Sequence, residues 1–308
     1  MAGLRMAQAV LITGSDGFVG QHLIKYLAGQ GLTILAASRS STNATHQRIR
    51  HIQVPDLAST FDWRPLLSQC DAVVHLAGVA HRRASERSYI SVNIQGTASL
   101  AQAARDTGTK HFVFVSSIAA QCGSFSDQPQ SEDSPPRPTN AYGRSKLEAE
   151  DAVRSSGVPH TILRPVVIYG LGEKGNFALL SKVARLPIPL PFGSLDAPRS
   201  VLSINNFNSA VDFVLTSPHT IGETIIVSDP NVVSVTGMIA AYRVALNRPP
   251  NLFSVPEKWI ETALSSLGYR AAWNRMGAPL VATPNKLIRM GWKPVHSNFS
   301  PGVISIAA

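Results

Sequence analysis

The chain of 308 residues is predicted to be an α/β protein with a Rossmann-type, doubly wound parallel sheet and a smaller, discontinuous C-terminal substrate lobe. Three observations predict this fold. The first half alternates short β-branched runs with amphipathic stretches, which is typical of a parallel sheet covered by helices on both faces. A glycine-rich turn follows the first strand. Beyond residue 170, prolines break the chain into short pieces, which indicates a smaller lobe.

The first half supplies six predicted strands, at Ala9–Thr13, Thr33–Ser38, His51–Val54, Ala72–Leu76, His111–Ser116 and His160–Val167. Amphipathic patterns between them predict helices at Val19–Ala28, Ile90–Arg105 and Ala141–Ser155. Counted along the chain, the strands are expected in the order 3-2-1-4-5-6, with the functional site at their carboxyl ends.

The domain boundaries follow from the same pattern. Residues 1–170 are predicted to form the domain of the parallel sheet, and residues 171–308 mainly the smaller lobe. Segments near residues 200–230 are expected to return to the first domain or its edge, because Ser200–Ile204 and Glu223–Val227 are strand-like. The Ser- and Pro-rich stretch Ser124–Asn140 is predicted to be a loop.

Composition excludes several classes of protein. With 44% hydrophobic and 15% charged residues, the chain can bury a sizeable core, which excludes disorder. No stretch approaches the roughly 20 apolar residues that a membrane span needs, so we expect no stable membrane insertion. Two cysteines, and an N-terminus without a signal-peptide pattern, favour the cytoplasm. No cluster of His and Cys predicts a metal site.

The net charge of +9 comes from dispersed Lys and Arg residues rather than from a basic block. Because no nucleic-acid-binding motif accompanies it, we expect no nucleic-acid partner. A basic surface suits an anionic diphosphate substrate or an acidic membrane surface. An ordinary solvated surface explains the charge at least as well.

The turn after the first strand carries glycines at a spacing of three and three. Gly14 allows the tight turn, Gly17 lets the backbone approach a pyrophosphate, and Gly20 permits close packing of helix on strand. Phe18 and Val19 begin the helix whose free N–H groups would face the phosphates. A plain tight turn is the alternative. The strand–turn–helix context favours a dinucleotide site.

The second strand ends in Ser38-Arg39-Ser40, where an NAD-selective site usually has an Asp or Glu. Arg39 therefore favours NADP(H), although an arginine stacked on adenine would leave NAD(H) possible. The ends of the third and fourth strands are expected to line the cofactor through Asp56, Leu57, Leu76, Ala77 and Gly78.

Tyr142 and Lys146 are predicted to be the catalytic pair. They lie four residues apart on a predicted helix, so both side chains share one face. A tyrosine titrates near about 10, so its use as an acid or base at neutral pH needs a cation that stabilises phenolate. Lys146 is suited to supply that cation. Ser117, at the end of the fifth strand, is placed to hydrogen-bond the substrate oxygen whose proton Tyr142 would exchange.

Together these motifs resemble the NAD-dependent epimerase/dehydratase family of extended short-chain dehydrogenases/reductases. The similarity runs nearly end to end and includes Asn93-Ile94-Gln95-Gly96-Thr97, Val115-Ser116-Ser117 and Arg164-Pro165-Val166-Val167-Ile168-Tyr169-Gly170. It implies that Asn93 keeps the helix open for a water relay and that Lys146 holds the nicotinamide ribose. It also implies that Ser116 and Pro165 contact the cofactor, and that the helices holding Ile90–Arg105 and Ala141–Ser155 pair in a homodimer.

The resemblance also implies that residues 1–170 form an NAD(P)-binding domain and residues 171–308 mainly a nucleotide-sugar-binding lobe, with residues for a UDP-sugar substrate. Asn176 would touch the diphosphate, Leu180 and Phe192 would lie near the uracil, and Arg199 would clamp the diphosphate with its planar fork. Arg275 is a further candidate ligand. A helix cap for Asn176 and a core position for Phe192 are the alternatives.

The resemblance points to two reactions at the sugar C4. The first is the NAD(P)H-dependent 4-ketoreduction of UDP-4-keto-6-deoxy-N-acetylglucosamine to UDP-N-acetylquinovosamine, for surface polysaccharide synthesis, and Arg39 favours it. The alternative is a UDP-glucose or UDP-N-acetylglucosamine 4-epimerase with tightly bound NAD. Ile118-Ala119 replaces the acidic pair that 4,6-dehydratases carry, which disfavours dehydration. A non-catalytic NAD(P)-binding regulator is disfavoured because Tyr142 and Lys146 are both present.

Overall fold

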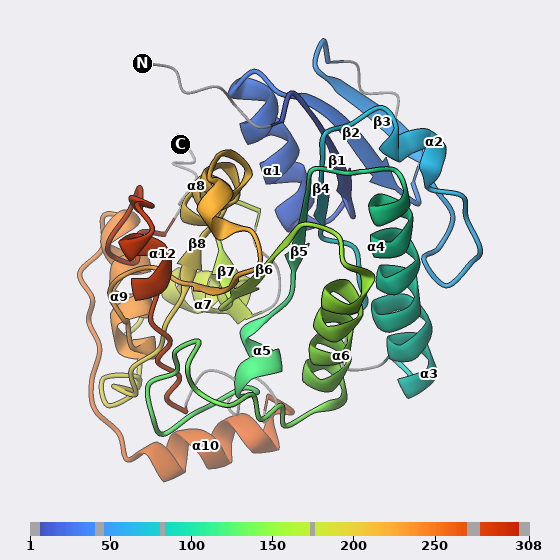
Figure 1. Cartoon of the computed structure of the whole chain (residues 1–308). Coiled ribbons are helices and arrows are strands. Elements are labelled where there is room, and N and C mark those ends of the chain that lie inside the picture. Colours follow the sequence, from blue (N-terminus) through green and yellow to red (C-terminus); the bar gives the residue numbers. More distant parts are fainter. Residues whose placement is uncertain (1–6, 41–45, 81–83, 173–175, 270–277, 302–308) are drawn as a thin grey trace.

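A parallel sheet of seven strands runs through the computed structural model (Figure 1), which describes residues 7–40, 46–80, 84–172, 176–269 and 278–301. The strand order is β3-β2-β1-β4-β5-β6-β9, so the predicted doubly wound order is confirmed and a seventh strand extends it. The strands are β1 (Ala9–Thr13), β2 (Thr33–Ser38), β3 (Ile49–Gln53), β4 (Ala72–His75), β5 (His111–Val115), β6 (His160–Pro165) and β9 (Thr224–Val227).

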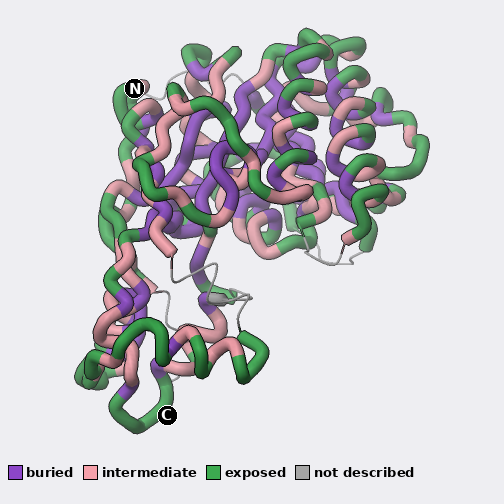
Figure 2. The backbone as a smooth tube through the Cα atoms, turned by 90° about the horizontal axis from the view of Figure 1, so that it is seen from below, coloured by how far each residue is buried: buried purple, intermediate pink, exposed green. Residues whose placement is uncertain are grey.

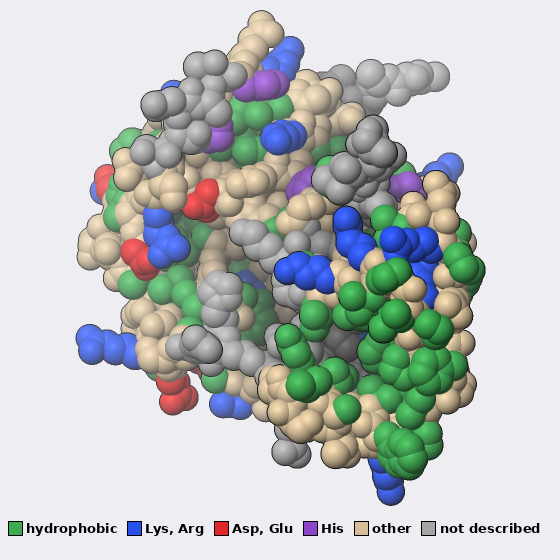
Figure 3. Space-filling model, turned by 180° about the vertical axis from the view of Figure 1, so that it is seen from behind, with side chains coloured by type: hydrophobic (Ala, Val, Ile, Leu, Met, Phe, Trp, Pro, Cys, Tyr) green, Lys and Arg blue, Asp and Glu red, His purple; other side chains and the backbone are tan. Residues whose placement is uncertain are grey.

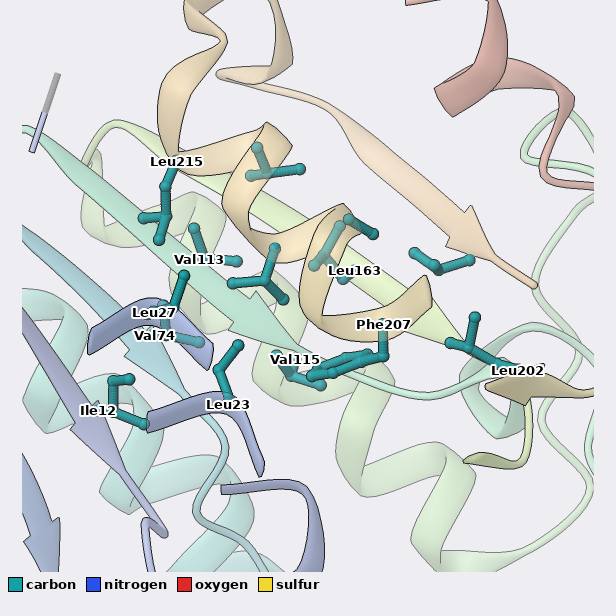
Figure 4. Close-up of a cluster of buried hydrophobic side chains, with 14 of the residues drawn as sticks. Ile12, Leu23, Leu27, Val74, Val113, Val115, Leu163, Leu202, Phe207 and Leu215 are labelled. Carbon is teal, nitrogen blue, oxygen red and sulfur yellow. The ribbon is translucent and has the colours of Figure 1, made fainter. Parts of the chain in front are cut away.

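Helices cover both faces of the sheet. On one face lie α1 (Phe18–Gly29) and α8 (Ile204–Thr216), and on the other lie α2 (Arg64–Leu67), α4 (Thr97–Asp106) and α6 (Ala141–Ser156). Because both faces are buried, the central strands read as continuous apolar runs rather than as an alternating pattern. Figure 4 shows Leu23 and Leu27 of α1 and Phe207 of α8 among strand side chains of the first face.

The helix before α4 differs from the prediction. A single helix was predicted over Ile90–Arg105, whereas the structure has α3 (Glu86–Ser88), a π-helix η1 (Tyr89–Gly96) and then α4. A π-helix has a wider turn than an α-helix, and such turns are frequent at functional sites. Hydrophobic periodicity predicts a helix here but does not distinguish the two forms.

The helix α6 is bounded by clear local signals. The Asn140 side chain accepts a hydrogen bond of 2.8 Å from the Gly143 N–H at the first turn. Gly157 ends the helix in the left-handed conformation, with φ of 72°. These caps fix the register of α6 and therefore the positions of Tyr142 and Lys146.

The C-terminal part adds a smaller lobe with its own core (Figure 2). It contains α7 (Asn176–Ala184), α9 (Val235–Ala245) and α10 (Glu257–Ser266), and further short elements are α5 (Ile118–Gln121), η2 (Pro218–Thr220) and α12 (Asn285–Arg289). A second sheet pairs β7 (Ile168–Tyr169) with β8 (Leu202–Ser203) in parallel. No helix in the described ranges has the length and apolar character to cross a membrane.

The strand expected at Ser200–Ile204 is shorter than predicted. The Ser203 side chain accepts a hydrogen bond of 3.1 Å from the Asn206 N–H and so starts α8 at Ile204. This N-cap outweighs the β-branched pattern of the segment. The segment joins β7 in the second sheet, and α8 packs on the main sheet instead.

Candidate active site

A cavity of about 630 Å³ opens beside β5, β6 and the start of α6. Its polar lining includes Ser117, Tyr142, Tyr89, Glu86 and Arg199. The carboxyl ends of β5 and β6 meet here, which is where ligands bind in open α/β sheets. The predicted catalytic tyrosine and serine therefore share one cavity.

Tyr142 lies at the first turn of α6 and faces Ser117. Burial raises the pKa of the Tyr142 phenol, and a hydrogen bond with the Ser117 side chain acts in the opposite direction. The Ser117 hydroxyl also accepts a hydrogen bond of 3.1 Å from the Ala119 N–H, because Ser117 is the N-cap of α5. The start of α5 thus holds the serine against the tyrosine.

Lys146 lies buried one helical turn beyond Tyr142. Its Nζ donates a hydrogen bond of 2.8 Å to the Val115 carbonyl and lies 4.3 Å from the centroid of the Phe114 ring. Burial lowers the pKa of Lys146 to about 8, and the charge of Glu150 opposes that shift. Lys146 is therefore a buried cation that would gain from a phenolate nearby.

Asn93 lies in the π-helix and links the end of β4 to α6. Its Oδ1 accepts from the Val79 N–H at 2.7 Å, and its Nδ2 donates to the Val79 carbonyl and the Ser145 hydroxyl, both at 3.0 Å. A Cβ on Gly78 would lie 3.0 Å from Asn93 Oδ1 and 4.0 Å from Lys146 Nζ. The structure thus brings Asn93, Lys146 and the end of β4 together.

A second cavity of about 290 Å³ lies where β1, β2 and β4 end. Its lining includes eight of the predicted cofactor residues, Gly14, Gly17, Arg39, Asp56, Leu57, Leu76, Ala77 and Gly78. It also includes Asp16, Trp63 and Val92, for which the sequence offered no motif.

The glycine turn leaves no room for side chains. A Cβ on Gly20 would lie 2.3 Å from the Gly14 carbonyl oxygen, which is backbone and cannot move aside. Gly14 itself has a φ of 70°, and a Cβ there would lie 2.9 Å from Ala77. The close approach of α1 to the strand ends fits a bound dinucleotide pyrophosphate at the helix N-terminus.

Arg39 lies at the end of β2 with an exposed side chain. Its Nη1 donates to Asp56 Oδ2 at 2.9 Å, with 73% of the Arg39 side chain and 40% of the Asp56 side chain exposed. Ser40 Oγ lies 3.3 Å from Asp16 Oδ2. Asp16 and Asp56 therefore line the same cavity as Arg39. The prediction that Arg39 binds a 2′-phosphate did not take the negative charge of these two carboxylates into account.

Four other predicted cofactor residues, Phe18, Val19, Ser116 and Pro165, line neither cavity. Ser116 is buried, and its hydroxyl donates to Glu150 Oε1 at 2.6 Å, so Ser117 is the serine beside Tyr142. Phe18 and Val19 pack against the core of the first sheet face. Pro165 ends β6.

Among the predicted substrate residues, Arg199 lines the large cavity. It is 5% exposed, and its guanidinium donates to the Ser124 carbonyl at 3.3 Å and to the Ala278 carbonyl. Burial lowers the pKa of Arg199 to about 10. The guanidinium therefore already has partners from two segments of the chain.

The other predicted substrate residues lie elsewhere. Leu180 and Phe192 pack against the core of the small lobe and do not line the large cavity. Asn176 is the first residue of α7. Arg275 lies outside the described residues.

Two residues near the catalytic pair belong to no sequence motif that predicts a site. Tyr89 lines the large cavity, with its ring centroid 6.3 Å from that of Tyr142. His75 is fully buried, and its ring nitrogens lie 2.6 Å from Thr13 Oγ1 and 3.0 Å from Thr97 Oγ1. Burial lowers the pKa of His75 to about 3, with a smaller effect of Lys146. Within the described ranges, no group of His, Cys, Asp and Glu forms a metal site.

Comparison with known proteins identifies the class. The pattern of the NAD dependent epimerase/dehydratase family matches residues 10–228, and the chain belongs to this family. It is an NAD-dependent enzyme that acts on nucleotide-sugars. The predicted family and fold are thereby confirmed.

Several relatives in this family are 4-epimerases. A UDP-glucose 4-epimerase of Vibrio cholerae is 33% identical over 304 residues, which cover 94% of this chain and 92% of that protein. An N-acetyl-α-D-glucosaminyl-diphospho-ditrans,octacis-undecaprenol 4-epimerase of Escherichia coli O157:H7 is 32% identical over 190 residues, or 58% of this chain and 55% of that protein.

Solved structures show the same fold. A UDP-N-acetylglucosamine 4-epimerase from Bacillus cereus superimposes with a TM-score of 0.74 at 20% identity, over 94% of both chains. MoeE5, solved in complex with UDP-glucose and NAD, has a TM-score of 0.74 at 21% identity, again over 94% of both chains.

Proposed function

We propose that this enzyme moves hydride between a nicotinamide cofactor and C4 of a UDP-linked hexose, with Tyr142 exchanging the proton of the sugar O4. The observation that carries the proposal is the arrangement of three side chains. Tyr142 and Ser117 both line the large cavity, where the Ser117 hydroxyl lowers the pKa of the Tyr142 phenol, and the buried cation Lys146 lies one helical turn further along α6. The cavity of the glycine turn adjoins them through Gly78, which lies beside Lys146 and Asn93.

Each residue has a separate task in this mechanism. Tyr142 takes the O4 proton when the alcohol is oxidised and returns it when the ketone is reduced. Ser117 donates a hydrogen bond to the same oxygen. Lys146 stabilises the phenolate form of Tyr142, and its burial strengthens that interaction because the surroundings screen charge weakly. When bound, the nicotinamide ring donates or accepts the hydride.

One candidate net reaction is 4-epimerisation of UDP-glucose or UDP-N-acetylglucosamine. The full-length similarity to the Vibrio cholerae enzyme supports it. In this reaction Tyr142 first takes the proton of the O4 hydroxyl, and after the 4-keto sugar has rotated it returns a proton to the same oxygen. Inversion follows because the hydride would return to the opposite face of C4. The cofactor would stay bound throughout.

The second candidate is reduction of UDP-4-keto-6-deoxy-N-acetylglucosamine to UDP-N-acetylquinovosamine, for surface polysaccharide synthesis. Arg39 supports it, because an exposed guanidinium at the end of β2 suits the 2′-phosphate of an exchangeable NADPH. The buried Lys146 one helical turn from Tyr142 argues against a non-catalytic NAD(P)-binding regulator, because cofactor binding alone does not need a cation that stabilises phenolate.

Further parts of the proposal concern binding and assembly. Arg199 is the first candidate for the diphosphate, since it lines the cavity. Asn176, Leu180, Phe192 and Arg275 remain candidates for the nucleotide, and Asn93 for a water relay. We also propose a homodimer and a cytoplasmic location, without a nucleic-acid partner.

The test follows NADH and NADPH oxidation with UDP-4-keto-6-deoxy-N-acetylglucosamine, generated in place by a dehydratase, for the wild type, Tyr142→Phe and the control Tyr26→Phe. Stoichiometric oxidation that only Tyr142→Phe abolishes supports the reductase. Co-purified NAD together with conversion of UDP-glucose or UDP-N-acetylglucosamine to its C4 epimer supports the epimerase. Wild-type turnover by Tyr142→Phe in both assays would reject the mechanism.

A further inference from the structure

A fully buried carboxylate, Glu150, lies on α6 one turn beyond Lys146 and takes no part in the mechanism above. Its Oε1 accepts hydrogen bonds from Ser116 Oγ at 2.6 Å and from Arg164 Nε at 2.9 Å. Its Oε2 accepts from Arg164 Nη2 at 2.6 Å and from Arg154 Nη2 at 3.1 Å. Both oxygens are occupied by protein donors, so Glu150 is unsuited to act as an acid or base.

These hydrogen bonds join the elements that carry the catalytic side chains. Ser116 directly follows β5 and precedes Ser117, while Arg164 belongs to β6 and its Nη1 donates to Gln121 of α5. Lys146 supplies a second link, from its Nζ to the Val115 carbonyl. Two side chains of α6, Lys146 and Glu150, therefore hold residues 115–117 against this helix at two points.

The surroundings of Lys146 contain few charges. On its own helix it shares a face with Tyr142 and Glu150, and His75 of β4 faces it as a neutral ring because of burial. Arg164 of β6 forms an ion pair with Glu150, and Tyr89 of η1 raises the pKa of Tyr142. The negative charge of Glu150 raises the pKa of Lys146 against the larger, opposite effect of burial.

We propose that Glu150 is a positioning residue of this active site, an inference that rests on the proposed function. Its carboxylate orients the Ser116–Ser117 turn toward Tyr142 through the Ser116 hydroxyl. It also supplies the negative charge that keeps Lys146 cationic. Buried ion pairs add little stability by themselves. The positioning role therefore gives a reason for the buried pair between Glu150 and Arg164.

Two variants separate the two tasks. Glu150→Gln keeps the shape and removes the charge, so the alkaline limb of the kcat–pH profile should move to lower pH by about one unit. Ser116→Ala keeps the ion pair and removes the link to β5, so kcat should fall about 3- to 10-fold with an unchanged KM for the UDP-sugar and an unchanged alkaline limb. The control is Asp151→Asn, which removes the same charge from α6 at a side chain that is 67% exposed.

Glu150→Asp covers the case in which Glu150→Gln does not fold, because it retains the charge with a shorter reach. It should lower kcat and keep the alkaline limb of the wild type. A wild-type profile for Glu150→Gln, a shifted limb for Glu150→Asp, or a wild-type kcat for Ser116→Ala would overturn the inference. Tyr142→Phe, measured alongside, distinguishes a failure of the proposed function from a failure of the role of Glu150. An active Tyr142→Phe rejects the proposed function itself, whereas an inactive one with the results just named rejects only the role of Glu150.

Discussion

The two cavities of this enzyme are built in different ways. The smaller cavity, where we propose that the cofactor binds, is called the cofactor cavity. It is lined almost entirely by residues between 13 and 79, and the turns that follow β1, β2 and β4 make most of it. The larger cavity, where we propose that the substrate binds, is called the substrate cavity. It is lined by residues 80, 84, 86, 89, 117–119, 123–124, 140–142, 166–167, 199–200 and 280, so segments from much of the chain meet there.

The comparison shows that backbone geometry shapes the cofactor cavity, whereas side-chain chemistry defines the substrate cavity. In the cofactor cavity the important fact is the absence of side chains at Gly14 and Gly20. At the substrate cavity the important facts are the buried charge of Lys146, one helical turn from Tyr142, and the effect of the Ser117 hydroxyl on the pKa of Tyr142. Changes in the first cavity should therefore affect cofactor binding, and changes in the second should affect turnover.

The largest effect is expected for Lys146→Met. Loss of the cation should lower kcat about 1,000-fold, because the Tyr142 phenolate loses its stabilising charge. Methionine fills a similar volume in the buried site, so the fold should persist. Steady-state kinetics with the control Lys110→Met, whose side chain is 66% exposed and pairs with Asp71, tests this. Comparable turnover of the two variants would show that the substrate cavity does not depend on its buried charge.

The next effect tests the cofactor cavity through Gly20→Ala. The added Cβ meets the Gly14 carbonyl at 2.3 Å, so the variant should lose about 2 kcal/mol of stability and bind NAD at least tenfold more weakly. The control is Gly29→Ala, where no atom lies within 4 Å of the added Cβ. Urea unfolding and calorimetric titration provide the measurements. Weaker UDP-sugar binding with unchanged NAD binding would contradict the assignment of the cavities.

The third effect concerns acid stability of the sheet. Burial lowers the pKa of His75 to about 3 and of His111 to about 4, so both rings stay neutral in the folded protein while the unfolded chain binds protons near pH 6.5. Stability is thus intact above pH 6.5 and falls below it, by about 1.4 kcal/mol per pH unit for each histidine. Urea unfolding at pH 7, 6 and 5 measures the slope. His111→Asn should roughly halve it, whereas the exposed His219→Asn should leave it unchanged.

The smallest effect is expected for Arg39→Ser at the rim of the cofactor cavity. The variant should bind NADP(H) about tenfold more weakly and NAD(H) within twofold of the wild type, since only the 2′-phosphate needs the guanidinium. Its stability should change by about 1 kcal/mol or less, because the pair with Asp56 is exposed. Arg50→Ser on β3 is the matched control. Equal loss for both cofactors would assign Arg39 to the adenine instead.

Sequence patterns predicted the two cavities unequally. Eight predicted residues line the cofactor cavity, because a strand–turn–helix unit is a local structure that spacing reveals. Leu180 and Phe192 are predicted near the uracil, and in the structure they pack against the core of the small lobe without lining the large cavity. An apolar residue in a proline-rich segment has the same pattern in a core as in a binding site, so spacing alone does not separate the two.

The sequence by itself determined the parallel sheet, the glycine turn and the shared helix face of Tyr142 and Lys146. Each follows from periodicity or from contacts within a few residues. Only the tertiary structure decided that Ser116 turns to Glu150, that Tyr89 faces Tyr142 and that Arg199 bonds the Ser124 carbonyl. These partners are 34, 53 and 75 residues apart, and no local rule of backbone geometry extends over such separations.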